Sequence, residues 1–224
     1  AKTMRVVSVD LDNTLFLNKA VFKKVFEKHG IDYYPSKYWD MRDYPNEIRK
    51  EIFELFNKKE FVNQPLIEKD IGKLLNETSK AFDIKFVSSR GELLFLETAR
   101  RLMVEFPDFF TLDKLLFSSS RKSDTLKTMD LEMHFDDSPE VIKDLKKNNL
   151  SFTMISNGDT LYNHELRKNT SYVEKLSDGL IRLLDEPDVI RKKIMRATTD
   201  SESSVRYDEE NKPVYNTDES GNEL

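Results

Sequence analysis

Two aspartates two residues apart directly follow a short apolar run near the start of the chain. Asp10 and Asp12 come after residues 5–9, Arg-Val-Val-Ser-Val. A run this rich in valine predicts a buried strand, and alternation along it would point both carboxylates to the same side. Close carboxylates repel each other unless a cation lies between them, and Mg²⁺ is the usual cation for oxygen ligands. The alternative is a turn in which these acids bind only backbone amides.

Three further predicted strands end in polar residues suited to the same chemistry: Ser88 after 84–87, Lys122 after 115–117, and Asp136 with Asp137 after 131–135. A hydroxyl and backbone amides at a helix N-terminus can bind phosphate oxygens. Each residue also has a structural alternative, namely a helix cap for Ser88, a solvated lysine for Lys122, and a helix start before Pro139 for the acid pair. The shared position at the carboxyl ends of predicted strands favours the functional interpretation.

Apolar runs and amphipathic stretches alternate through most of the chain. A further run at 152–155 and helical patterns at 91–104, 122–129 and 139–147 complete this alternation. It predicts βαβ units, hence an α/β fold with a parallel sheet and helices on both faces. Residues 16–82 instead show only helical spacing. We expect them to form a helical cap over the carboxyl edge of the sheet, where open α/β folds bind ligands.

The composition limits the classes of partner. The chain has 224 residues, a net charge of −5 and no cysteine. This length suits one domain with an inserted subdomain, and the lack of cysteine excludes disulfide and thiolate chemistry and fits a cytoplasmic protein. No apolar stretch approaches the roughly 20 residues that span a bilayer. The negative charge gives no support for an extended nucleic-acid surface, so we expect neither a membrane nor a nucleic-acid partner.

These motifs resemble those of the haloacid dehalogenase superfamily of aspartate-nucleophile phosphohydrolases. The resemblance covers roughly residues 4–167, and the position of the insert is similar to that superfamily's C1 type of cap. Ser88-Ser89-Arg90 and the segment 134–139, His-Phe-Asp-Asp-Ser-Pro, are most similar to the cytosolic 5′(3′)-deoxyribonucleotidases and their phage and bacterial relatives. The resemblance implies a Rossmannoid core at 1–15 and 83–167, a cap at 16–82 and a C-terminal appendage at 168–224.

The resemblance also implies a mechanism, namely Mg²⁺-dependent hydrolysis of a phosphomonoester through an aspartyl-phosphate. Asp10 would be the nucleophile, and Asp12 would serve as general acid and then general base. Lys122 and Ser88 would offset charge on the phosphoryl oxygens. The metal would be held by Asp10, the main-chain carbonyl of Asp12, and one or both of Asp136 and Asp137.

A small phosphorylated molecule is the expected substrate, and a (deoxy)nucleoside monophosphate is the first choice. The candidate substrate-binding residues are Asn13, Thr14, Ser89, Arg90, Tyr38 and Trp39. The two aromatic residues lie in an irregular part of the cap, where a nucleobase could stack on them. A phosphosugar or another small phosphate is the alternative substrate. A non-catalytic binding module is the alternative class, against which the complete set of acids, hydroxyl and lysine argues.

The segment at about 179–213 has a different resemblance. It is similar to the part of tryptophanyl-tRNA synthetases that follows their KMSKS loop. The chain shows no HIGH-like motif, and its Lys175-Leu-Ser-Asp178 lacks the second lysine of the signature loop, so we do not expect aminoacylation. We expect one amphipathic helix with an apolar stripe of Ile190, Ile194 and Ala197, followed by an acidic tail without compact structure.

Overall fold

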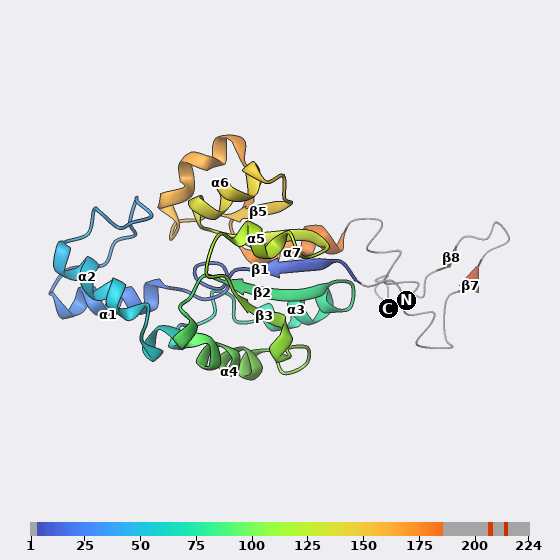
Figure 1. The fold of residues 1–224 in the computed structure, drawn as a ribbon, viewed down its shortest axis with the longest axis horizontal. Coiled ribbons are helices and arrows are strands. Elements are labelled where there is room, and N and C mark those ends of the chain that lie inside the picture. The colour runs from blue at the N-terminus through green and yellow to red at the C-terminus, as the bar shows by residue number, and fades with distance from the viewer. Residues whose placement is uncertain (1–3, 186–205, 208–212, 215–224) are drawn as a thin grey trace. The chain divides into compact units, whose positions relative to one another are not determined.

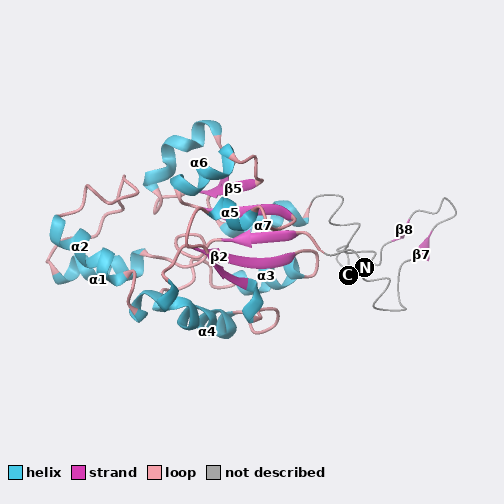
Figure 2. Cartoon of the chain, viewed as in Figure 1, coloured by secondary structure: helices cyan, strands magenta, loops and turns pink. Residues whose placement is uncertain are grey.

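The computed structural model describes residues 4–185, 206–207 and 213–214. The chain divides into two units, Ala1–Leu180 and Ile181–Leu224. The first unit holds a six-stranded, all-parallel sheet in the order β3-β2-β1-β4-β5-β6, drawn in magenta in Figure 2. Its strands are β1 (Val6–Val9), β2 (Asp83–Ser88), β3 (Leu115–Phe117), β4 (Leu131–Asp136), β5 (Phe152–Ile155) and β6 (Tyr172–Val173).

Strand β1 lies at the centre of the sheet, between β2 and β4. Val9 pairs with Phe86 on one side and with Phe135 on the other, and all four residues of β1 are buried. Both sides of a central strand are covered when helices lie on both faces of a parallel sheet, so its sequence is a continuous apolar run. The predicted strand at the start of the chain is therefore confirmed.

The connecting helices lie on both faces of the sheet. The steps from β1 to β2 to β3 run in one direction across the sheet, and the steps from β3 to β4 to β5 run in the other. Because parallel crossovers are right-handed, helices of the two sets cover opposite faces. These helices are α3 (Ile71–Ser79), α4 (Phe95–Glu105), α5 (Lys122–Leu126) and α6 (Pro139–Lys147), with the short 3-10 helices η2 (Glu92–Leu94), η3 (Leu112–Lys114) and η4 (Leu161–Asn169). The predicted α/β fold is confirmed.

The inserted helices lie beyond the carboxyl ends of the strands, as Figure 1 shows for α1 (Lys19–Lys28) and α2 (Asn46–Leu55). With the 3-10 helix η1 (Lys59–Asn63) they enclose an apolar core that includes Phe26 and Ile52, both fully buried. Residues 1–180 form one compact unit, so the division between core and cap at 15/16 and 82/83 stays a prediction.

The chain enters and leaves the cap through two neighbouring segments that hydrogen-bond to each other. The backbone N–H of Leu17 donates to the carbonyl of Pro65 at 2.9 Å, and that of Ile67 donates to Leu15 at 2.9 Å. Phe16, fully buried, forms a β-bridge with Leu66 between these bonds. The two linkers therefore act as a single joint between the inserted helices and the edge of the sheet.

Residues 172–180, which the sequence analysis placed in the C-terminal appendage, contribute to the sheet and to the core. Strand β6 pairs with β5, and the following helix α7 (Leu176–Leu184) begins with Leu176 and Leu180 buried. A two-residue strand has too little periodicity to be recognised from sequence, which explains why only five strands were expected. In the second unit, β7 (Arg206–Tyr207) and β8 (Pro213–Val214) pair antiparallel.

The remaining C-terminal expectations concern residues that the structure does not describe. The helix with the stripe of Ile190, Ile194 and Ala197 lies outside the described residues, as does the acidic end of the chain. Among the described residues, no helix combines the length and apolar character needed to cross a membrane.

The close approach of α7 to β4 gives a test of this fold. A Cβ on Gly179 would lie 2.3 Å from Cε1 of Phe135, which belongs to β4. We expect Gly179→Ala to lower the free energy of unfolding by about 1–3 kcal/mol through overpacking, although alanine has the higher helix propensity. Gly158→Ala is the control, since no atom lies within 4 Å of its Cβ position. Equal denaturant midpoints for the two variants would contradict this packing.

Candidate active site

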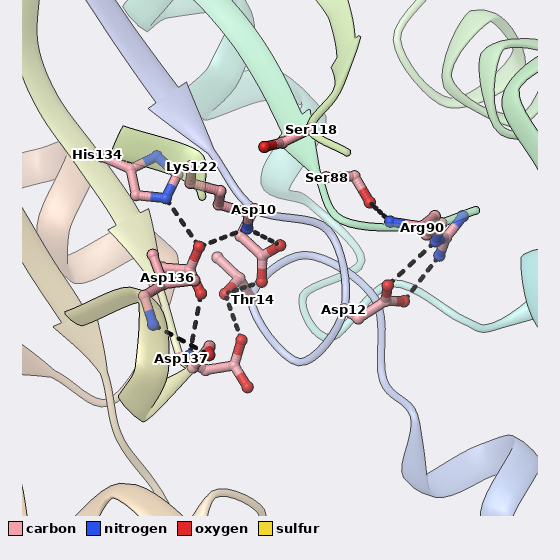
Figure 3. A network of polar contacts seen from close by, with 12 residues as sticks. Asp10, Asp12, Thr14, Ser88, Arg90, Ser118, Lys122, His134, Asp136 and Asp137 are labelled. Atoms are coloured by element: carbon pink, nitrogen blue, oxygen red, sulfur yellow. Dashed lines mark hydrogen bonds and ion pairs between the residues drawn. The ribbon is translucent and has the colours of Figure 1, made fainter. Parts of the chain in front are cut away.

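A buried lysine joins two aspartates at the carboxyl edge of the sheet (Figure 3). Asp10 follows β1, Lys122 begins α5, and Asp136 ends β4. The Nζ atom of Lys122 lies 2.8 Å from Oδ1 of Asp10 and 2.6 Å from Oδ2 of Asp136. Only 3% of the lysine side chain is exposed. The tertiary structure thus brings together three residues that are up to 126 positions apart in sequence.

Asp136 is held from three sides. Its Oδ2 also contacts Nε2 of His134 at 2.8 Å, and Nδ1 of that histidine lies 2.6 Å from Oγ of Ser8. Its Oδ1 accepts the backbone N–H of Ser138 at 3.0 Å, and Ser138 caps the N-terminus of α6. Neither Ser8 nor His134 is predictable from the sequence as a support for Asp136, because only the pairing of β1 with β4 places them opposite each other.

These contacts separate the protonation states of the buried groups. Burial alone would raise the pKa of Asp136, but Lys122 and the hydrogen bond from His134 hold that pKa at about 2. Burial alone would lower the pKa of Lys122, but the carboxylates of Asp10 and Asp136 raise it above its ordinary value. Burial lowers the pKa of His134. The cluster therefore contains an ionised carboxylate, a charged lysine and a neutral histidine near neutral pH.

Asp10 and Asp137 have the opposite tendency. Burial, followed by the charge of Asp136, raises the pKa of Asp10 from 3.8 to about 6. Burial, followed by the charges of Asp10 and Asp136, raises the pKa of Asp137 well above its usual value. One lysine is thus insufficient to neutralise three crowded acids, and a cation among them would relieve the repulsion.

The positions of these three carboxylates suit a Mg²⁺ ion. Oxygen atoms of Asp10, Asp136 and Asp137 all lie within 4.8 Å of one another. Opposite ligands of an octahedral Mg²⁺ are separated by about 4 Å, so small side-chain rotations would bring the three onto one ion. The carboxylate of Asp12 is not part of this group, and the expected contribution of its main-chain carbonyl stays a prediction.

Asp12 is bound by Arg90 instead. Nη2 of Arg90 donates to Oδ1 of Asp12 at 2.8 Å, and Nε donates to Oδ2 at 3.1 Å, which makes a two-point ion pair. Nη1 of Arg90 donates to Oγ1 of Thr98 at 3.0 Å. Figure 3 shows the carboxylate of Asp12 turned towards Arg90. The guanidinium of Arg90 thus donates to protein partners in this structure. Its expected contact with substrate stays a prediction.

Asn13 and Thr14 follow Asp12 in the loop after β1 and lie beside the acidic cluster. Oγ1 of Thr14 lies 3.3 Å from Oδ2 of Asp10 and 3.4 Å from Oδ1 of Asp137. Asn13 has a left-handed backbone with φ of 60°, a conformation that asparagine tolerates better than most residues. Its side chain accepts the N–H of Asn18 at 3.1 Å and donates to the hydroxyl of Tyr162 at 3.1 Å. Substrate binding by Asn13 and Thr14 stays a prediction.

Ser88 ends β2, and Ser89 follows it. The hydroxyl of Ser88 is buried and accepts the backbone N–H of Arg90 at 3.1 Å, so it closes the turn after the strand. Ser88 thus closes a turn and is not the helix cap considered as its structural alternative, since η2 begins after Gly91. A hydroxyl can still donate a hydrogen bond while it accepts one. Ser89 lines the cleft beside Arg90.

An open cleft of about 1000 Å³ leads to the acidic cluster. Asp10, Asp12 and Lys122 lie in its wall, together with residues of the cap. A smaller pocket of about 160 Å³ adjoins it, and Trp39 lines both. The aromatic residues of the smaller pocket are Phe22, Tyr33, Tyr38, Trp39, Tyr44, Phe53, Phe56 and Tyr162.

Tyr162 connects this aromatic pocket to the acidic cluster. Its ring meets that of Trp39 edge-on, with centroids 5.0 Å apart, and its hydroxyl donates to Asp137. Burial and the charge of Asp137 raise the pKa of Tyr162, so the hydroxyl keeps its proton. The neighbouring Asn163 donates to the backbone carbonyl of Asp137 at 2.8 Å. Neither Tyr162 nor Asn163 was among the site residues predicted from the sequence, where they belong to a polar segment after the last predicted strand.

Solved structures of haloacid dehalogenase-like hydrolases have a similar fold. A member from Streptococcus pneumoniae is 13% identical with a TM-score of 0.52, covering 81% of this chain and 99% of that one. A member from Burkholderia xenovorans is 12% identical with a TM-score of 0.51, covering 84% and 99%. A phosphonoacetaldehyde hydrolase-like protein from Oleispira antarctica is 12% identical with a TM-score of 0.51, covering 91% and 97%. At these identities the likeness shows the fold.

Matches by sequence to curated proteins are short, and no protein-family model matches the chain. The tryptophan–tRNA ligase of Leifsonia xyli is 43% identical over 63 residues, which are 27% of this chain and 18% of the ligase. Tryptophan–tRNA ligase 1 of Streptomyces coelicolor is 66% identical over 32 residues, 14% of this chain and 10% of the ligase. The chain spans less than a fifth of these relatives. The described α/β unit therefore has the haloacid dehalogenase-like fold, and the ligase likeness is confined to a short segment.

The raised pKa of Asp10 predicts how stability depends on pH without metal. Folded Asp10 keeps its proton up to about pH 6 and the unfolded residue only to 3.8, so the free energy of unfolding should fall as pH rises between these values. Asp10→Asn removes this loss. In EDTA its melting temperature should therefore exceed the wild-type value by a few degrees above about pH 7, and by less near pH 4.

Two controls accompany this prediction. Asp108→Asn changes an exposed acid and should leave the melting temperature unchanged at both pH values. Mg²⁺ should raise the melting temperature of the wild type more than that of Asp10→Asn, because binding to the folded state stabilises it. Destabilised Asp10→Asn in EDTA at neutral pH would contradict the account of repulsion among these acids.

Proposed function

We propose that this protein is a Mg²⁺-dependent phosphomonoester hydrolase that acts through an aspartyl-phosphate on Asp10. The observation that carries this proposal is the setting of that carboxylate. One oxygen is bound by Lys122 at 2.8 Å, the other lies 3.3 Å from the hydroxyl of Thr14, and the residue lines an open cleft. A carboxylate fixed in this way presents a lone pair to a phosphate that enters the cleft, which is the geometry that nucleophilic catalysis requires.

Each step of the reaction has a residue to carry it. Asp12 enters the first step protonated. An oxygen of Asp10 attacks phosphorus, and the bond from phosphorus to the ester oxygen breaks as Asp12 gives its proton to that oxygen. Water then attacks the aspartyl-phosphate and gives its proton to Asp12, which releases inorganic phosphate and restores Asp10. Lys122 offsets negative charge on the phosphoryl oxygens. Bound Mg²⁺ would neutralise Asp136 and Asp137 and polarise the phosphoryl group.

We propose (deoxy)nucleoside monophosphates as the substrates. The aromatic pocket of about 160 Å³ adjoins the cleft at Trp39, so a flat base could enter it while the phosphate remains near Asp10. The pocket is smaller than the roughly 300 Å³ of a site for a whole drug-sized ligand, and a single planar group suits it better. Stacking on aromatic side chains contributes roughly 1–3 kcal/mol per base. A sugar phosphate has no planar group to use this pocket.

The activity is tested by measuring phosphate release from a panel of deoxynucleoside monophosphates and sugar phosphates with Mg²⁺. We expect the nucleotides to be hydrolysed with the higher kcat/KM. Asp10→Asn should lose turnover by several orders of magnitude while it stays folded, because an amide cannot attack phosphorus. EDTA should abolish the wild-type activity. Folded Asp10→Asn protein with wild-type turnover would eliminate the covalent mechanism.

The choice of substrate is tested at Trp39. We expect Trp39→Ala to raise KM for a nucleotide by roughly 10-fold, since about 1–3 kcal/mol of stacking is lost. The same variant should leave kcat/KM for a small sugar phosphate within about twofold, because the contacts near Asp10 are intact. Equal losses on both substrates would show that Trp39 supports the cap and does not select a base.

A further inference from the structure

Arg90 is an unusually buried arginine for a residue beside an open cleft. Only 2% of its side chain is exposed, whereas 24% of the Asp12 side chain is exposed. A buried guanidinium is costly unless its donors are satisfied, and here Nε, Nη1 and Nη2 all donate to protein oxygens. Because so little of this side chain is exposed, few of its N–H groups can reach a substrate. Its function therefore depends on the protein groups that it binds.

The position of Arg90 links three parts of the site. Its guanidinium carbon lies 5.7 Å from the ring centroid of Phe16 in the cap joint and 5.2 Å from that of Phe61 in the cap. Thr98, which it also binds, belongs to α4 of the core. The arginine is thus clamped by core and cap together, and its fork meets Asp12 in a fixed direction.

We propose that Arg90 is the positioning residue for Asp12, holding this carboxylate in one orientation for proton transfer; the inference rests on the proposed phosphohydrolase function. Two parallel hydrogen bonds fix both the direction and the plane of a carboxylate, which a single bond cannot do. An ionised carboxylate has about four lone-pair directions, and the fork uses two of them. The other two remain available to exchange a proton with a group in the cleft.

Orientation of Asp12 matters only where a proton must move. When the ester oxygen is part of a poor leaving group, such as the sugar hydroxyl of a nucleotide, cleavage needs its protonation. A dinitrophenolate leaves without that proton. The ratio of kcat/KM for a nucleoside monophosphate to kcat/KM for dinitrophenyl phosphate therefore reports on the proton donor. A change in general binding or folding would alter both values together.

The experiment measures this ratio for the wild type, Arg90→Gln, Arg90→Lys and Asp12→Asn with saturating Mg²⁺. We expect both Arg90 variants to lower kcat/KM for the nucleotide by roughly 10- to 100-fold, which is less than the full effect of a general acid. The value of kcat/KM for dinitrophenyl phosphate should fall by much less. The ratio measured for Asp12→Asn serves as the reference for an enzyme that has lost its proton donor. Lysine should not rescue, because it retains the charge and lacks the fork.

Arg101 offers a matched control at the same joint. Its guanidinium carbon lies 5.0 Å from the ring centroid of Phe16, and it donates to the carbonyl of Val62 at 3.1 Å and to Glu105 at 3.0 Å. Arg101→Gln thus removes an arginine that stacks on the same ring without touching Asp12. We expect any loss in this variant to be equal for the two substrates. Melting temperatures of all variants identify those that are unfolded.

Each outcome decides the inference. A selective loss on the nucleotide in Arg90→Gln and Arg90→Lys, absent from Arg101→Gln, supports it. An equal loss on both substrates, full rescue by lysine, or faster nucleotide hydrolysis overturns it, and the last would show that Arg90 restrains Asp12 unproductively. Should Arg90→Gln not fold, Arg90→Lys decides alone. A wild-type chain inactive on both substrates contradicts the proposed function and the inference with it.

Discussion

The pairing of one buried lysine with two carboxylates is the interaction on which the rest of this site depends. Lys122 binds Asp10 and Asp136 at 2.8 and 2.6 Å, and so ties together the ends of β1 and β4 and the start of α5. Removal of Lys122 would leave two buried carboxylates without their cation, and a buried charge that loses its partner typically costs about 3–5 kcal/mol. The cluster is therefore a structural constraint as well as a chemical one, and it still leaves an excess of negative charge that favours a divalent cation.

The inserted helices give this edge of the sheet a second wall. Their two linkers hydrogen-bond to each other beside Phe16, and the cleft between cap and sheet reaches the acidic cluster on one side and an aromatic pocket on the other. Trp39 and Tyr162 meet edge-on across this boundary, and Tyr162 also binds Asp137. A ligand that fills the aromatic pocket would thus contact Tyr162, which also binds a carboxylate of the proposed metal site.

The short segment after β5 completes the sheet and the hydrophobic core. Strand β6 has two residues, yet it extends the sheet and leads into α7, where Gly179 lies against Phe135 immediately before Asp136. Glycine has a low helix propensity, but position 179 requires it because a larger side chain would collide with Phe135. The proposed chemistry uses no residue from the segment that is similar to tryptophan–tRNA ligases.

The sequence by itself determined the strands that carry the site, because apolar runs that end in Asp10, Ser88 and Asp136 have a period and an ending that few other elements share. It determined the α/β class and the helical insert for the same reason, and the structure confirms both. It could not determine the partners of the polar groups. Ser8 beneath His134, Arg90 on Asp12, and Tyr162 on Asp137 join residues far apart in the chain. Such contacts depend on strand order and on the placement of the cap, which only the packing of the whole domain decides.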